Sequence, residues 1–160
     1  MDASFTAEEH FLRGEDALRA ERREEALEHF RAAHRLDATR PLYRSFYGLM
    51  VGLSEKRFDR ALELCRSAAR EEFFNPEHYH NLAQLHLAFG FKAEAIRYLR
   101  RGQMIDPDNP RILARLADLG MRRRPPLLFL RRQHVLNRWI GRLRGRPSMT
   151  QEPELSASSV

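Results

Sequence analysis

The sequence predicts an all-α protein: an α-solenoid in which about three helix pairs stack, followed by a capping helix and a basic, amphipathic C-terminal helix. The main observation is a repeat. Alanines recur at spacings of 35 and 34 residues, large side chains follow four residues later, and small residues follow seven residues later. Apolar residues at this spacing form one buried helix face, and small residues let two helices approach closely. The three sets are Ala26, Ala61 and Ala95; Phe30, Cys65 and Leu99; Ala33, Ala68 and Gly102.

Each unit is expected to be a helix, a short turn and a second helix. A further set of small residues (Gly14, Gly48 and Ala83) lies in the first helix of each unit. Prolines stand near three expected helix starts, where the missing N–H costs little. The last helix has no second helix after it, so we expect it to cover the final apolar face. The expected helices span 5–20, 23–36, 41–53, 57–71, 76–89, 92–105 and 110–120.

The third unit, residues 76–107, resembles a tetratricopeptide repeat along nearly its whole length. Tyr79 falls at the large aromatic position of the first helix, Gly90 at the turn, and Asp106-Pro107 at the close of the unit. The first unit (7–40) and the second (41–75) match in register through the small and apolar positions given above. The second unit lacks the closing Asp-Pro pair and has Glu71-Glu72-Phe73-Phe74-Asn75-Pro76 instead. The resemblance implies a right-handed solenoid whose concave surface binds a protein or peptide.

In this family the first helix of each pair lines the concave surface. The family's carboxylate clamp uses lysine, asparagine and arginine. It is absent here, because Phe11 and Glu15 stand at its first lysine and asparagine, and Glu77 at another lysine. The resemblance therefore argues against binding of heat-shock chaperone tails. The alternative, that several groove residues only pack between units, stays open. The register places these residues in the groove: Phe11, Glu15 and Leu18; Ser45, Leu49 and Gly52; His80, Gln84 and Leu87.

The charge of the chain is concentrated in one segment. Residues 1–121 carry 19 basic and 20 acidic side chains, whereas 122–146 carry nine arginines and no acid. We expect three parts: a solenoid over 1–121, a proline-interrupted basic segment with an amphipathic helix at about 133–144, and a disordered tail over 147–160. The residues that define the basic segment are Arg122, Arg123, Arg124, Arg131, Arg132, Arg138, Trp139 and Arg142.

Four interpretations of the basic segment are open. Its apolar stripe could fold back as a cap on the solenoid, it could lie on an anionic membrane surface, or it could dock in the groove of another protein. It could also contact nucleic-acid phosphates, but the sequence has no base-reading module or stacking surface, which argues against nucleic acid.

The sequence contains no recognisable catalytic motif. It has no nucleophile elbow, P-loop or dinucleotide-binding glycine motif, and no credible strand. The seven histidines lack metal-ligand spacing, and Cys65 takes a buried position of its repeat. We therefore predict no enzyme activity, no metal and no cofactor. A single cysteine excludes an internal disulfide, and the acidic N-terminus differs from a secretion signal, so the cytoplasm is the expected location. Arginine makes up 26 of 28 basic residues, a bias typical of a GC-rich bacterial genome.

The sequence thus predicts a protein–protein interaction module, a scaffold or adaptor. The alternative is a peripheral membrane-associated assembly protein that uses the arginine-rich amphipathic C-terminal helix. The identity of the partner is not encoded in any motif.

Overall fold

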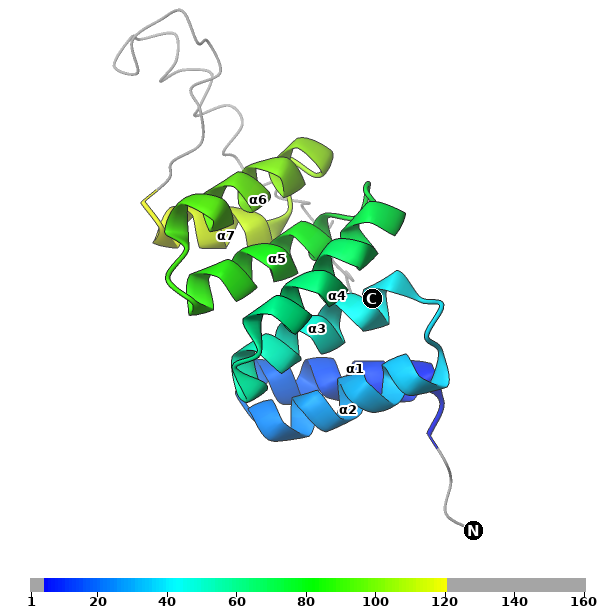
Figure 1. Cartoon of the computed structure of the whole chain (residues 1–160). Coiled ribbons are helices and arrows are strands. Elements are labelled where there is room, and N and C mark those ends of the chain that lie inside the picture. Colours follow the sequence, from blue (N-terminus) through cyan, green and yellow to red (C-terminus); the bar gives the residue numbers. More distant parts are fainter. Residues whose placement is uncertain (1–4, 121–160) are drawn as a thin grey trace, which may run out of the picture. The chain divides into compact units, whose positions relative to one another are not determined.

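The computed structural model describes residues 5–120, and within them it has seven α-helices and no strand. The described residues belong to one compact unit. Figure 1 shows the helices stacked in chain order, from the blue α1 and α2 to the yellow α7. The fold is the predicted solenoid: three helix pairs followed by a single helix. The helices are α1 (Ala7–Arg19), α2 (Arg23–Leu36), α3 (Pro41–Glu55), α4 (Phe58–Glu71), α5 (Pro76–Ala88), α6 (Lys92–Ile105) and α7 (Pro110–Asp118).

Five of the seven helix starts agree with the sequence prediction, whereas α1 starts two residues later and α4 one residue later than predicted. Proline opens α3, α5 and α7. Thr6 and Glu9 form a reciprocal capping box at α1. The helix ends differ more: α3 runs two residues beyond the predicted 53 and stops where Lys56 adopts a left-handed conformation with φ 59°. The predicted helices 5–20, 57–71, 76–89 and 110–120 are one to three residues shorter in the structure.

Close helix crossings occur where the sequence predicted them. The alanines Ala26, Ala61 and Ala95 have no exposed surface. A Cβ atom added to Gly14 would lie 2.8 Å from the ring of Phe30, in the partner helix of the same pair. Small residues in the first helices therefore let each pair close tightly, as the repeat spacing implied.

The central helices α3 and α5 are buried on nearly every side. Nine residues of α3 and eight of α5 are buried, against three in α1 and two in α7. The larger core cluster joins the first two helix pairs to α5, and a second cluster of Ala83, Ala95, Leu99, Ile112 and Leu116 seats α7. The last helix thus covers the end of the solenoid, because Ile112 and Leu116 bury its apolar stripe.

The predictions for the basic segment and the tail concern residues 122–160, which lie outside the described residues. Among the helices of residues 5–120, none is both long enough and apolar enough to cross a membrane.

Candidate protein-binding surface

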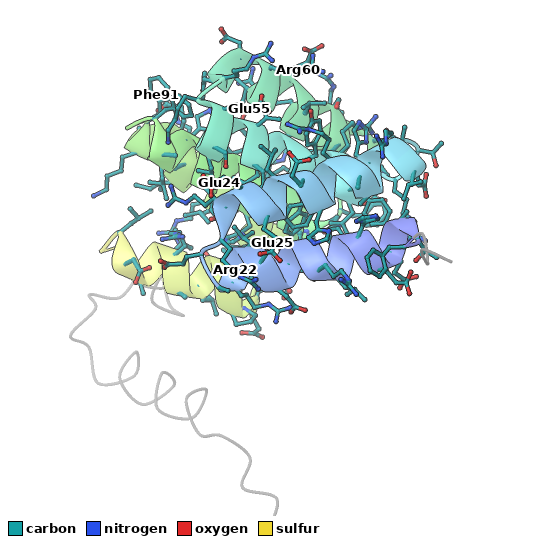
Figure 2. All side chains as sticks on the ribbon, turned by 90° about the horizontal axis from the view of Figure 1, so that it is seen from below. Arg22, Glu24, Glu25, Glu55, Arg60 and Phe91 are labelled. Atoms are coloured by element: carbon teal, nitrogen blue, oxygen red, sulfur yellow. The ribbon has the colours of Figure 1, made fainter. Side chains whose placement is uncertain are left out.

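Arg111, the second residue of α7, joins three helices of the solenoid. Its Nη1 lies 2.8 Å from a carboxylate oxygen of Glu77 in α5, and its Nη2 lies 3.2 Å from a carboxylate oxygen of Glu15 in α1. The two ion pairs raise the pKa of Arg111 against the opposing effect of partial burial. Figure 2 shows α1 and α7 at the same side of the solenoid, where this ion pair links them. One side chain of α7 therefore bridges α1 and α5.

His80 of α5 lies beside this ion pair. Its side chain is only 7% exposed, and burial, with smaller effects of Arg111 and Arg115, lowers its pKa to about 4. The imidazole is therefore neutral at pH 7. Gln84 Nε2 lies 3.2 Å from His80 Nδ1, so the amide donates to this nitrogen and the ring proton sits on Nε2. We call the side chains that interact through these ion pairs, this hydrogen bond and the electrostatic effects on His80 the inner surface: Glu15, Glu77, His80, Gln84, Arg111 and Arg115.

Several residues that the register placed in the groove are buried between the units instead. Phe11 packs its ring on Phe30, Tyr43 and Phe46 at centroid distances of 5.0 to 5.6 Å. Ser45 and Leu49 have no exposed surface. These three residues have little or no surface to offer a ligand in this structure, which corresponds to the packing alternative.

The burial of Ser45 has a specific polar basis. Its hydroxyl accepts a hydrogen bond from Asn81 Nδ2 at 3.1 Å, and its backbone carbonyl accepts one from the Cys65 thiol at 3.3 Å. These bonds join α3 to α4 and α5. Ser45 is therefore part of the contact between the second and third units.

Four of the remaining groove residues keep some exposed surface, whereas His80 and Gly52 are buried. Glu15, Leu18, Gln84 and Leu87 are half-buried, and Gly52 is buried against Leu85. Glu15 and Gln84 belong to the inner surface, while Leu18 and Leu87 pack on the edges of the core clusters. The groove prediction thus narrows to these four residues, and their role in binding stays a prediction.

Sequence reasoning missed Arg111 and Arg115. One signal could have found Arg111. It stands 34 residues after Glu77, at the same position of the next unit, so opposite charges face each other on neighbouring helices. No local pattern shows that Glu15, 96 residues before Arg111 in the sequence, is the second carboxylate that Arg111 contacts.

The Cys65 thiol and the side chains of His10 and His29, which lie next to each other, are fully or partly buried. Burial raises the pKa of Cys65 to about 12, so the thiol is not a nucleophile at neutral pH. His10 and His29 place their Nδ1 atoms 3.0 Å apart, and burial lowers the pKa of His10. Within residues 5–120 no group of three histidine, cysteine, aspartate or glutamate side chains is arranged to hold a metal ion. The basic-segment residues, from Arg122 to Arg142 and including Trp139, lie outside the described part of the chain.

Comparison with known proteins supports the repeat assignment. The tetratricopeptide repeat family model matches residues 52–119. A comparison with curated proteins gives no match. Among solved structures, the chain is similar to the tetratricopeptide domain of Arabidopsis OM64, with a TM-score of 0.57 and 17% identity, over 72% of this chain and 93% of that one.

Two further structures have the same fold. One is YrrB, described as a tetratricopeptide protein with an unusual peptide-binding site; its TM-score is 0.56 at 16% identity, over 72% of this chain and 59% of that chain. The other is the first tetratricopeptide domain of Spaghetti (RPAP3), bound to the HSP90 peptide SRMEEVD; its TM-score is 0.56 at 16% identity, over 72% and 90% of the two chains. At these identities the likeness establishes the fold.

Proposed function

Because this chain is a tetratricopeptide repeat protein, we propose that it is a protein–protein interaction module that binds a partner protein or peptide on its inner surface. The observation that carries the proposal is the bridge from Arg111 to Glu15 and Glu77, which gathers side chains of α1, α5 and α7 on one face. Such solenoids use the face shared by successive units for extended or helical segments.

The solved structures support a peptide as the bound species. The titles of two similar proteins name a peptide-binding site and a bound HSP90 peptide. The chemistry of the present surface differs from the clamp described above, because Glu15 and Glu77 stand where two of the clamp residues belong. We therefore propose that the partner is not an HSP90-type acidic tail. We also propose that binding takes place in the cytoplasm.

The charges of the inner surface indicate the partner's chemistry. Glu15 and Glu77 face the single charge of Arg111, because Arg115 is paired with Asp118 at 3.8 Å. His80 is neutral because its pKa is near 4. A segment that enters this surface must separate Arg111 from Glu15, which leaves one carboxylate without its partner. A lysine or arginine of the incoming segment would restore that ion pair. Leu18 and Leu87 at the edges would contact apolar anchors.

Affinity capture from native cells with matched variants tests this function. Gln84→Arg adds a long cation to the inner surface, and Glu15→Gln removes one of its carboxylates, both without altering the core. The control is Glu63→Gln, on the exposed side of α4. We expect a stoichiometric partner with wild type and with the control, and a loss of at least about tenfold with the combined inner-surface variant. A partner retained by that variant would contradict the proposal.

A second candidate function rests on the sequence beyond the described residues. Nine arginines and no acid over 122–146 favour an anionic membrane surface. Flotation with vesicles of equimolar phosphatidylcholine and phosphatidylglycerol tests it. Membrane association requires that the full chain floats and that a chain cut after Gly120 does not; equal behaviour of the two chains removes this candidate.

A further inference from the structure

The three loops that follow α2, α4 and α6 have the same length, and each is held by hydrogen bonds of its first residue. They cover residues 37–40, 72–75 and 106–109. In each, the first residue is acidic and its N–H donates to a carbonyl of the preceding helix. In the second and third loops that carboxylate also accepts from the side chain of the last residue, as in Glu72 with Asn75 at 3.1 Å and Asp106 with Asn109 at 3.2 Å. In the first loop Asp37 instead accepts from the N–H and the hydroxyl of Thr39, at 3.1 and 2.6 Å. In every loop these bonds start from the acidic first residue.

The two middle residues of each loop are exposed in all three units. The first loop has Ala38 and Thr39 there, and the third has proline and aspartate. The second loop has Phe73 and Phe74, each 64% exposed. Since small or polar residues suffice at the same position in both other units, the fold does not require two aromatic rings here. Exposed aromatic pairs of this kind mark interaction sites.

The Phe73–Phe74 pair is held on a fixed backbone. The Tyr79 hydroxyl donates to the carbonyl of Phe73 at 2.9 Å, and the Tyr79 ring is itself buried. The two phenylalanine rings contact each other edge to face, with centroids 5.7 Å apart. Binding of a ligand to the two rings would order little additional backbone, and so would lose little conformational entropy, because the backbone beneath them is already fixed.

Of the charged side chains that the structure describes near the two rings, the carboxylates have ion-pair or hydrogen-bond partners and the arginines have neither. Arg101 lies over the Tyr79 ring at 5.3 Å, and Arg70 stands in the last turn of α4, two residues before the loop. Neither arginine has an ion pair among the described residues. The nearby carboxylates are engaged: Glu71 pairs with Arg44, and Glu72 accepts from His78 and Asn75. The unengaged charge beside the two rings is therefore positive.

We propose that Phe73, Phe74, Arg70 and Arg101, which we call the loop surface, dock a segment of a partner protein that carries aliphatic or aromatic side chains flanked by carboxylates. This surface goes beyond the proposed inner-surface function and uses different residues.

Two other occupants fit less well. An anionic bilayer would meet the Glu71 side chain, which is 54% exposed and stands two residues before Phe73. A second copy of the chain, related by a two-fold axis through the rings, would bring Arg70 and Arg101 of both copies together. Repulsion between like charges disfavours that arrangement.

A phage-displayed library of random linear peptides, selected on the full chain, tests the loop surface. The variant is F73A/F74T, which gives the second loop the residues of the first, so its fold should be retained; far-UV circular dichroism and the melting temperature check this. Synthetic versions of the selected peptides are then measured by fluorescence anisotropy. We expect peptides that combine apolar residues with aspartate or glutamate, about tenfold or more weaker binding to F73A/F74T, and about threefold weaker binding to Arg101→Gln with marked salt dependence.

The control and the opposing outcomes separate the occupants. Gln84→Arg, on the inner surface, should leave binding of these peptides unchanged. Peptides that lose affinity with Gln84→Arg and not with F73A/F74T report the inner surface, and overturn the loop surface while supporting the function proposed above. Selection of no peptide sensitive to F73A/F74T overturns the proposal. So does a dimer of wild type that the variant lacks, or flotation with equimolar phosphatidylcholine and phosphatidylglycerol vesicles that the variant loses.

Discussion

Gly48→Ala tests the close helix crossing in the middle of the solenoid, because two physical effects predict opposite signs. Gly48 lies in α3, and an added Cβ would lie 2.8 Å from Leu64 Cβ, 3.0 Å from Cys65 Sγ and 3.2 Å from the carbonyl oxygen of Ala61. Two of these atoms belong to the backbone or are Cβ atoms, so they cannot rotate away. Only a shift of α4 relative to α3 would make room.

Overpacking of a tight core costs about 1–3 kcal/mol, and the fixed neighbours place this site near about 3. Replacing glycine by alanine inside a helix contributes about 1 kcal/mol in the other direction. We therefore expect Gly48→Ala to lower the free energy of unfolding by about 2 kcal/mol, with a fall in melting temperature of roughly 5–10 °C. Urea denaturation followed by circular dichroism measures it. A variant more stable than wild type, which helix propensity alone predicts, would refute the close crossing.

Three further predictions concern buried and bridging side chains. Burial and the nearby arginines hold the pKa of His80 at about 4 instead of the ordinary 6.5. The stability contributed by the neutral imidazole is therefore fully present above pH 6.5 and is lost as the pH falls toward 4, by up to about 3 kcal/mol. His80→Gln should flatten this part of the stability–pH curve, and an unchanged curve would contradict the assignment. Cys65, with its pKa raised to about 12, should resist an aromatic disulfide reagent in the native protein and react fully in urea, whereas fast native labelling would show that it is accessible. The half-exposed Arg111–Glu15 pair should give a coupling of about 0.5 kcal/mol in a double-mutant cycle, smaller at high salt, and additive single variants would show that the bridge contributes nothing.

Most of the helix map could be predicted from the sequence because the signals are local. Pro41, Pro76 and Pro110 each open a helix, and the recurrent Ala26, Ala61 and Ala95 lie at buried crossings. Helix ends were less accurate, since the left-handed conformation at Lys56 is not marked by a glycine. The resemblance to tetratricopeptide repeats further implied that the first helix of each pair lines the concave surface.

The binding surface was harder to predict because it depends on contacts between distant units. The register put Phe11, Ser45 and Leu49 in an open groove, but the surrounding helices bury them. How far neighbouring units cover α3 depends on the curvature of the whole stack, which no local pattern encodes. The Arg111–Glu15 bridge joins residues 96 apart for the same reason. The exposure of Phe73 and Phe74 could have been inferred, because the loops of the first and third units carry small or polar residues at the same place.

The inner surface as the site of partner binding is tested most directly by photo-crosslinking in living cells. A photoreactive amino acid replaces Gln84 on the inner surface in one strain, and Arg97, whose side chain is 79% exposed on α6, in another. The proposed function predicts a discrete adduct with one other protein from the Gln84 strain and none from the Arg97 strain. Adducts of equal intensity at both positions, or no adduct at Gln84, would contradict it.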